Sequence, residues 1–294
     1  MAVPTCCHAA DTLRVLSNEP DPMPMPSLQL VIELFALGAF TGFLAGLLGI
    51  GGASLLVPIL TLLLSARGVE SGHAVKMAVA TSMSTILFTS ISSLRAHHRR
   101  GAVRWDLVRG MAPGIVLGSL LGGAGAFALL KGSALALVFS LFVTFSATQM
   151  LLDRRPAASR RMPGPLGQGV AGAGIGFLSG LVGAGGAFVS VPFMTWCNVA
   201  MHNAVATSAA LGFPIALAGT LGYVIGGWSV PPALPGAFGY LYLPALVCIA
   251  MASVLTAPFG ARAAHRLDVR QLKRVFATLL YALAAYMLYK VLSG

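Results

Sequence analysis

Charged side chains are scarce in this sequence. Only 9% of its 294 residues are Asp, Glu, Lys or Arg, whereas 57% are hydrophobic. A soluble domain typically has about 25% charged residues. Because so few charges cannot cover the chain with a water-facing surface, the composition excludes an ordinary soluble domain.

Cysteine is also scarce, and the 4 cysteines have no spacing typical of a metal or redox site. The sequence likewise lacks a GxSxG motif, an HExxH motif and paired intramembrane aspartates. We therefore expect no metal, no cofactor and no enzymatic activity. The total of 8 acidic residues argues against export of a hard cation, which prefers oxygen ligands.

Long apolar runs, in contrast, are abundant. One example is APGIVLGSLLGGAGAFALL at 112–130, close to the roughly 20 residues that span a bilayer as a helix. These runs predict an all-α, polytopic membrane protein whose partner is the lipid bilayer. The net charge of +11 is explained by lysine and arginine retained at the cytoplasmic face, so we expect no nucleic-acid partner.

The sequence contains an internal duplication. GFLAGLLGIGGASLLVP at 42–58 returns as GFLSGLVGAGGAFVSVP at 176–192, and AVATS occurs at both 78–82 and 204–208. Chance does not easily produce both matches in the same order. We divide the chain into a disordered N-terminal tail (1–27), a first transmembrane repeat (28–152), a cytoplasmic linker (153–166) and a second transmembrane repeat (167–294).

Each repeat is predicted to contain four elements. The first element is a segment interrupted by glycine, and three long helices follow it. In the first repeat these elements are 28–65, 73–95, 107–130 and 134–152; in the second they are 167–198, 203–227, 239–262 and 271–292.

Basic residues orient the two repeats. Most of the 19 lysines and arginines fall in three clusters, at 95–109, 154–161 and 262–274, which the positive-inside rule places in the cytoplasm. The interrupted segment 28–65 must then begin and end outside, and the segment 167–198 must begin and end inside. Interrupted segments in matching positions of two inverted repeats are typical of the binding site of a secondary transporter.

Glycines at the two interruptions are the main candidate binding residues. Gly-x-Gly-Gly lets the backbone turn at little steric cost, and the helix that follows presents free N–H groups and a positive dipole end. Such an end favours an anion. The candidates are Gly49, Gly51, Gly52, Gly183, Gly185 and Gly186. We interpret Gly42, Gly46, Gly176 and Gly180 instead as small residues for helix packing.

Hydroxyl and basic side chains occur at matching positions in both repeats. The hydroxyls of Thr81, Ser82, Thr207 and Ser208 are candidate donors to an anion, although such groups also bond to the preceding helical turn. Lys76 and His202 are candidates for guiding an anion at its two entrances, although such residues often snorkel to the interface. Glu33 is interpreted as an interfacial carboxylate.

The two glycine stretches, both AVATS motifs and the RRGAVRW at 99–105 resemble the TauE/SafE sulfite-exporter family over about 28–292. The resemblance implies export of sulfite, an organosulfonate or a related small sulfur oxyanion across the bacterial inner membrane. The residues by themselves indicate only a transporter of a small anion. They leave open a passive anion channel of the same architecture, and they leave open a homodimer.

Overall fold

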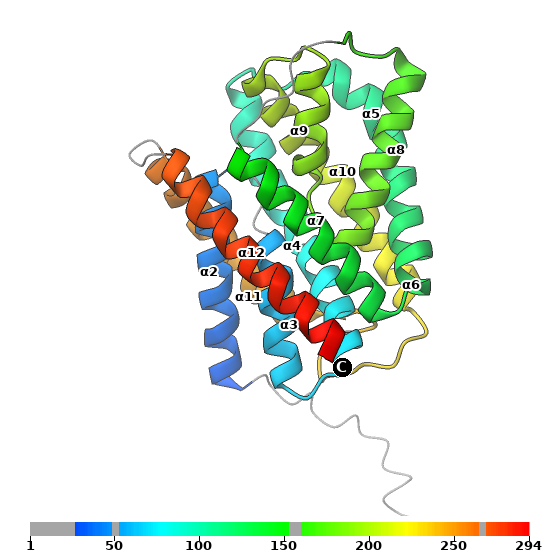
Figure 1. Cartoon of the computed structure of the whole chain (residues 1–294), viewed down its shortest axis with the longest axis vertical. Helices are drawn as coiled ribbons and strands as arrows, with labels where there is room; N and C mark the ends of the chain where they lie inside the picture. The colour runs from blue at the N-terminus through cyan, green and yellow to red at the C-terminus, as the bar shows by residue number, and fades with distance from the viewer. Residues whose placement is uncertain (1–26, 49–52, 153–159, 265–268, 294) are drawn as a thin grey trace, which may run out of the picture.

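The computed structural model describes residues 27–48, 53–152, 160–264 and 269–293. Nearly all of them are helical (Figure 1). The helices are α2 (Leu28–Leu48), α3 (Ala53–Ala66), α4 (Ser71–Arg99), α5 (Trp105–Leu120), the π-helix η1 (Leu121–Ala126), α6 (Phe127–Leu129), α7 (Gly132–Leu152), α8 (Pro165–Val182), α9 (Ala187–Trp196), α10 (Met201–Gly227), α11 (Leu243–Ala264) and α12 (Val269–Ser293). The strands are β1 (Ala237–Phe238) and β2 (Leu241–Tyr242).

Seven helical stretches among the described residues are long and apolar enough to cross a membrane. They are α2, α4, the continuous rod from α5 through α6, α7, α8, α10 and α11. The all-α, polytopic class predicted from composition is therefore confirmed. The predicted tail lies outside the described residues except for Ser27, as do the first glycine tip and the linker residues 153–159.

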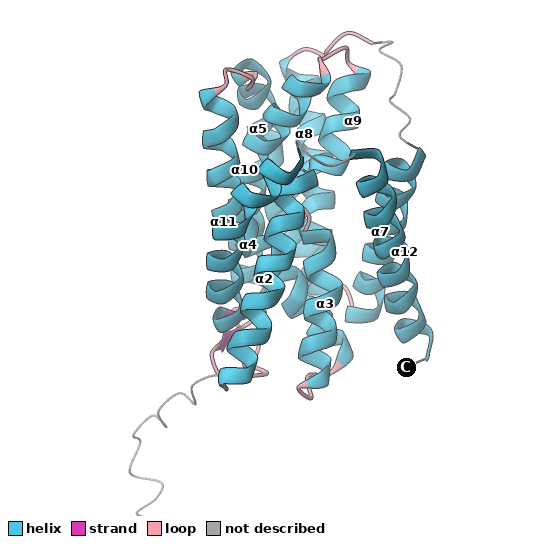
Figure 2. Cartoon of the chain, turned by 90° about the vertical axis from the view of Figure 1, so that its left-hand side faces the viewer, coloured by secondary structure: helices cyan, strands magenta, loops and turns pink. Residues whose placement is uncertain are grey.

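The two helices that follow the glycine interruptions are short. α3 has 14 residues and α9 has 10, which at 1.5 Å per residue gives about 21 Å and about 15 Å. Both are shorter than a hydrocarbon core of about 30 Å. Figure 2 shows α3 at one end of the molecule and α9 at the other. The arms that precede them, α2 and α8, are longer, with 21 and 18 residues, so the interrupted segments have arms of unequal length.

Helix α2 packs closely against α11, far away in the sequence. A Cβ atom added at Gly38 would lie 2.7 Å from the Cα atom of Ile249, and one added at Gly42 would overlap Ser253. The Ser253 hydroxyl also donates a 2.9 Å hydrogen bond to the Gly38 carbonyl. The prediction that Gly42 serves helix packing is confirmed.

Helix α8 packs against α5 in the same way. Added Cβ atoms at Gly172 and Gly176 would overlap the carbonyls of Met111 and Ile115. Gly180 continues this contact, since its added Cβ atom would lie 2.7 Å from the carbonyl oxygen of Ser119. Gly176 and Gly180 are thus packing glycines, as predicted. The first helix of each predicted repeat therefore finds its closest partner in the other repeat.

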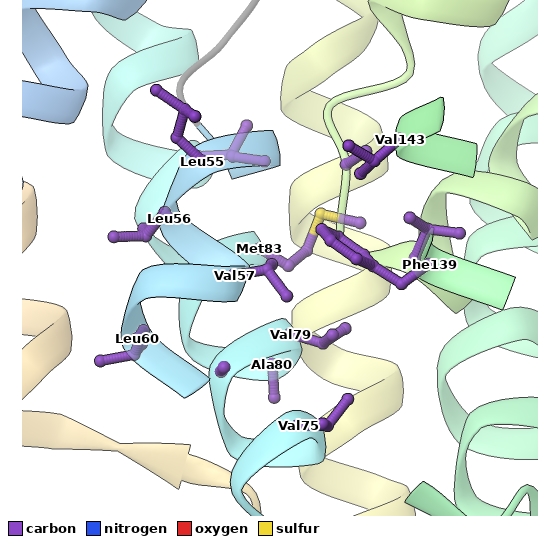
Figure 3. Close-up of a cluster of buried hydrophobic side chains, with 14 of the residues drawn as sticks. Leu55, Leu56, Val57, Leu60, Val75, Val79, Ala80, Met83, Phe139 and Val143 are labelled. Carbon is purple, nitrogen blue, oxygen red and sulfur yellow. The ribbon is translucent and has the colours of Figure 1, made fainter. Parts of the chain in front are cut away.

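The apolar core extends across both halves of the chain. Figure 3 shows α3 contributing Leu55, Leu56, Val57 and Leu60, α4 contributing Val75, Val79, Ala80 and Met83, and α7 contributing Phe139 and Val143. The same cluster includes Ile215 and Tyr223 of α10 and Ile249 of α11. The tightly packed core holds the short helices in place, although neither could span a bilayer alone.

Two local features differ from the sequence prediction. The helix predicted over 107–130 contains the wide π turn η1, which includes three glycines. The helix predicted to begin at 239 begins at Leu243, because 237–242 form a hairpin in which Ala237 pairs with Tyr242. The glycine at the bend of this hairpin, Gly239, has φ +54°, a conformation that only glycine adopts easily.

Candidate functional site

The second glycine tip forms a sharp turn between α8 and α9. Gly183 ends α8 with φ 72° and Gly186 precedes α9 with φ 74°, both in the left-handed region. The amide of Gly183 donates to the Ser179 carbonyl at 2.8 Å, which closes the last turn of α8. The glycines at 183 and 186 are thus required by backbone conformation, as the Gly-x-Gly-Gly pattern predicted.

The tip lies between α4 and α10. A Cβ atom at Gly183 would come within 2.9 Å of the Val79 carbonyl, and one at Gly186 within 2.5 Å of the Ile215 side chain. Gly185 is different, because an added Cβ atom would make only an ordinary contact with Ile86, at 3.7 Å. Gly185 is also partly exposed, whereas its glycine neighbours are buried. There is therefore space beside Gly185.

Several backbone N–H groups at this tip make no hydrogen bond within the described fold. Within the described residues, no group accepts a hydrogen bond from the amides of residues 185–188, and the first bonds of α9 come from Val189 and Ser190 to the Gly186 carbonyl. These amides form the positive end of the α9 dipole. This arrangement can hold an anion without any charged side chain.

Thr81 and Thr207 are fully buried and join the two predicted repeats. Thr81 on α4 accepts a 3.1 Å hydrogen bond from the amide of Tyr242, which directly precedes α11. Thr207 on α10 accepts a 3.1 Å bond from the amide of Arg104, which directly precedes α5. Each threonine oxygen is thus a structural acceptor.

The two serines of the motifs have different surroundings. The Ser208 hydroxyl lies 2.7 Å from the Ser190 hydroxyl in the first turn of α9, so it fastens α9 to α10. The buried Ser82 hydroxyl has no hydrogen-bond partner within the described structure, and the same holds for Ser54 in the first turn of α3. Ser82 lies on α4 between Val79 and Ile86, which contact the positions of added Cβ atoms at Gly183 and Gly185.

The alternative interpretation of the motif hydroxyls is a hydrogen bond to the preceding helical turn. Two residues that follow the first AVATS motif make such bonds. Ser84 donates to the Ala80 carbonyl at 2.9 Å and Thr85 to the Ser82 carbonyl at 2.7 Å. In the part of the chain that the structure describes, none of the four motif hydroxyls makes a bond of this kind. Both motif threonines and Ser208 act between helices instead.

Lys76 and His202 occupy unlike environments. The Lys76 ammonium group donates to the Ala128 carbonyl at 3.1 Å and lies 5.2 Å from the centre of the Tyr240 ring. It lines a cavity of about 600 Å³. His202 is exposed at the start of α10. The two predicted entrances are therefore not equivalent in structure.

Sequence reasoning missed several polar residues. Lys131, His73 and Tyr240 line the same cavity as Lys76. In the sequence, the only sign of this is that Lys131 lies in a loop away from the arginine clusters.

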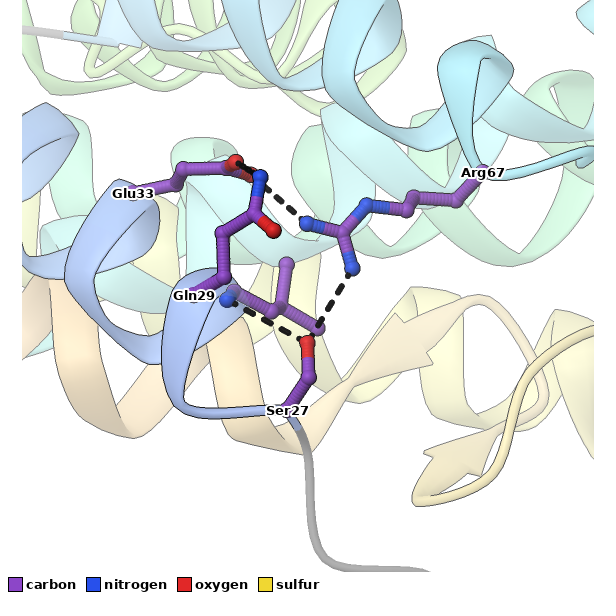
Figure 4. Close-up of polar contacts among 5 residues, drawn as sticks. Ser27, Gln29, Glu33 and Arg67 are labelled. Atoms are coloured by element: carbon purple, nitrogen blue, oxygen red, sulfur yellow. Dashed lines mark hydrogen bonds and ion pairs between the residues drawn. The ribbon is translucent and has the colours of Figure 1, made fainter.

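Glu33 forms a 2.8 Å ion pair with Arg67 and accepts a bond from Gln29 (Figure 4). The pair joins the first turns of α2 to the residue that follows α3, and it is about one third exposed.

Arg104 forms a short-range ion pair beside the arginine-rich loop. Its guanidinium group bonds both carboxylate oxygens of Asp106 at 2.9 and 2.6 Å. The hydrogen bond and the charge of Asp106 raise the pKa of Arg104. Both side chains of the pair are about half exposed, consistent with a position in water at the membrane surface.

Comparison with known proteins now adds to this geometry. A family model described as "Sulfite exporter TauE/SafE" matches residues 34–287. The chain belongs to the TauE/SafE family. The resemblance identified from its glycine stretches and AVATS motifs is thereby confirmed.

Individual relatives of this TauE/SafE chain extend over most of its length. A "Probable membrane transporter protein" of Haemophilus influenzae is 34% identical over 261 residues, which cover 88% of this chain and 98% of the relative. One of Methanocaldococcus jannaschii is 24% identical over 265 residues, covering 89% and 96%. No solved structure matches the chain. The chain is thus a multi-pass membrane protein of a transporter family.

Proposed function

We propose that the protein is a secondary transporter that exports a small anion, namely sulfite, an organosulfonate or a related sulfur oxyanion, across the bacterial inner membrane. The structural observation that supports this most directly is the set of unbonded amides at residues 185–188 beside the open space at Gly185. The family description supplies the substrate class.

The second tip supplies one half of the proposed site. Its amides, with the unpartnered hydroxyl of Ser82, offer hydrogen bonds to oxygens that spread negative charge over several atoms. Gly49, Gly51 and Gly52 lie outside the described residues, and the proposal assigns them the same role from the opposite side. Hydrogen bonds to a charged group contribute about 1.5–3 kcal/mol each, so a few amides can compensate part of the cost of dehydrating an anion.

Export of an anion is favoured by the membrane potential. In a cell that is negative inside, an outgoing charge gains about 2.3 kcal/mol for each ~100 mV. Movement of one repeat against the other would expose the site to each face in turn. No proton-coupling carboxylate is assigned, since Glu33 is paired with Arg67 at the edge of the bundle.

Flux measurement in proteoliposomes tests the proposal. The purified chain is reconstituted, a negative-inside potential is imposed, and efflux of sulfite, ethanesulfonate, sulfate and chloride is followed. We expect efflux of sulfite or ethanesulfonate that saturates with concentration. Efflux that does not saturate, with single-channel currents, would favour the channel alternative. A folded preparation that moves none of the four anions refutes the proposal.

A further inference from the structure

A cavity of about 600 Å³ lies where α4 and α7 begin. Two lysines, Lys76 and Lys131, line it together with His73, Tyr240 and Met287. We call it the lysine cavity. Its volume is within the range of about 300–1,000 Å³ that is typical of pockets for small organic ligands.

The lysine cavity lies at the outer end of the molecule. Helix α4 begins beside the cavity at Ser71 and ends in the arginine cluster at Arg99. Since the positive-inside rule places that cluster in the cytoplasm, the cavity faces the opposite side.

Cations at this outer end are few and therefore informative. Apart from the arginine clusters, the basic residues after the N-terminal tail are Arg67, Lys76, Lys131 and Lys290. Arg67 is paired with Glu33, whereas Lys76 and Lys131 both line the same cavity. The positive-inside rule disfavours lysine on the outer side, and both lysines of this cavity are exceptions to it.

Neither lysine is neutralised by a carboxylate in the described parts of the chain. Lys76 uses one donor on the Ala128 carbonyl at 3.1 Å and approaches the Tyr240 hydroxyl at 3.5 Å, and an ammonium group has three donors. Lys131 is exposed; its backbone carbonyl accepts from the Leu135 amide at 3.0 Å, but among the described residues its ammonium group has no ion-pair partner. Glu70 also lines the cavity, so the formal charges of these three residues leave a net positive charge.

The other residues that line the lysine cavity indicate that its ligand has an organic part as well as a negative charge. The Nε2 atom of His73 is buried and has no partner within the described structure, so it is free to bond a ligand. Apolar surface comes from Val75, Ala136 and Met287, and aromatic surface from Tyr240 and Tyr286. A bare inorganic ion would leave most of this surface and volume unused.

We propose that the lysine cavity is a separate, outward-facing binding site for a small organic anion. The negative head group binds between Lys76 and Lys131, and the organic part lies against Tyr240 and Met287. The proposal rests on the proposed function for the class of anion, and it names an organic sulfonate rather than sulfite as the ligand that this site prefers. The exposed His202 at the matching position means that the second repeat does not repeat the Lys76 environment.

Calorimetric titration of the purified full chain tests this site without any transport. Ethanesulfonate is the probe, with chloride as the competing anion. We expect Lys131→Gln to weaken binding by about tenfold, as loss of one charged contact implies, whereas Lys131→Arg retains it. Arg109→Gln, which removes an exposed cation at the cytoplasmic end, is the matched control and should bind normally.

The results separate this site from the proposed transport. Normal binding by Lys131→Gln, equal weakening by Arg109→Gln, or full competition by chloride at equal concentration overturns the lysine cavity as a site. Lysine-dependent binding in a chain that moves no anion supports the cavity and refutes the transporter. Sulfite efflux without any binding of ethanesulfonate does the reverse. Because Lys131 is exposed, its variants should fold even if Lys76→Gln does not.

Discussion

The hydroxyl oxygen of Thr81 accepts a hydrogen bond from the backbone amide of Tyr242 over a distance of 3.1 Å. Thr207 accepts one of the same length from Arg104. The threonines occupy the same place in the two AVATS motifs, and each amide belongs to the residue just before a long helix. This correspondence supports the prediction of two inverted repeats, because a twofold relation would generate one bond from the other.

Removing either threonine hydroxyl should destabilise the protein. Thr81→Val and Thr207→Val keep the side-chain shape and leave an amide without its acceptor, which costs about 1–3 kcal/mol. We expect a lower thermal unfolding midpoint in detergent for both variants. Thr→Ser at either position keeps the oxygen and is the control. An unchanged midpoint in both valine variants would show that these bonds do not join the repeats.

Replacing Ser82 should separate stability from transport. Its buried hydroxyl has no partner among the residues that the structure describes, and a buried, unsatisfied polar group costs free energy. Ser82→Ala is therefore expected to leave the unfolding midpoint unchanged or raised, while efflux of the transported anion falls. Ser208→Ala is the contrast, since it removes the bond to Ser190 and should lower the midpoint. Full efflux by Ser82→Ala would remove this residue from the site.

Adjacent glycines should respond differently to the same substitution. Gly186→Ala places a side chain at φ 74° and 2.5 Å from the Ile215 side chain, and a left-handed conformation alone costs about 1–2 kcal/mol for other residues. Gly185→Ala meets only Ile86 at 3.7 Å. We expect a clear loss of thermal stability for the first variant and little loss for the second. Similar losses in both would contradict the described turn.

Filling the space at Gly185 should block transport without unfolding the protein. Gly185→Val adds a side chain beside the free amides, where the anion is proposed to bind. We expect a folded chain with efflux reduced by at least about tenfold, which corresponds to about 1.4 kcal/mol. Gly174→Val is the matched control, because nothing lies within 4 Å of its added Cβ atom. Retention of full efflux by Gly185→Val would move the binding site elsewhere.

Loss of the Glu33 charge should have little effect. The Glu33–Arg67 pair is about one third exposed on both sides, and exposed pairs contribute about 0–1 kcal/mol. Glu33→Gln should therefore change the unfolding midpoint slightly, and less at high salt. Efflux and its pH dependence should match the unaltered chain. A changed pH dependence would make Glu33 part of a proton-coupled step.

The helical class and most helix positions could be predicted from the sequence because they depend on apolar run length alone. The run predicted at 203–227 is α10, Met201–Gly227. Local turn chemistry is harder to predict. The π turn η1, which follows α5, and the hairpin before α11 are made from apolar residues and glycines. Such residues also fit a continuous helix, and tertiary contacts decide between the two.

The candidate site was only partly predictable. The left-handed glycines at 183 and 186 follow from a local rule, since the chain must turn there. The environment of Lys76 depends on Tyr240 and Ala128, which are distant in sequence and carry no motif. The different surroundings of Ser82 and Ser208 also depend on Ser190, which lies outside the AVATS motifs, in the glycine stretch 176–192. Whether the motif glycines bind an anion stays a prediction for the flux experiments.

The contact between α2 and α11 has a consequence for biogenesis. Helix α2 is the earliest described helix to leave the ribosome, and its partner is the next to last. Gly38 and Gly42 therefore lack Ile249 and Ser253, their partners in the fold, until more than two thirds of the chain has been synthesised. The stretch Leu28–Ala45 is long and apolar enough to cross a membrane, so α2 can stay inserted before its partner is made. The native bundle is consequently completed only late, when the last helices arrive to cover the first.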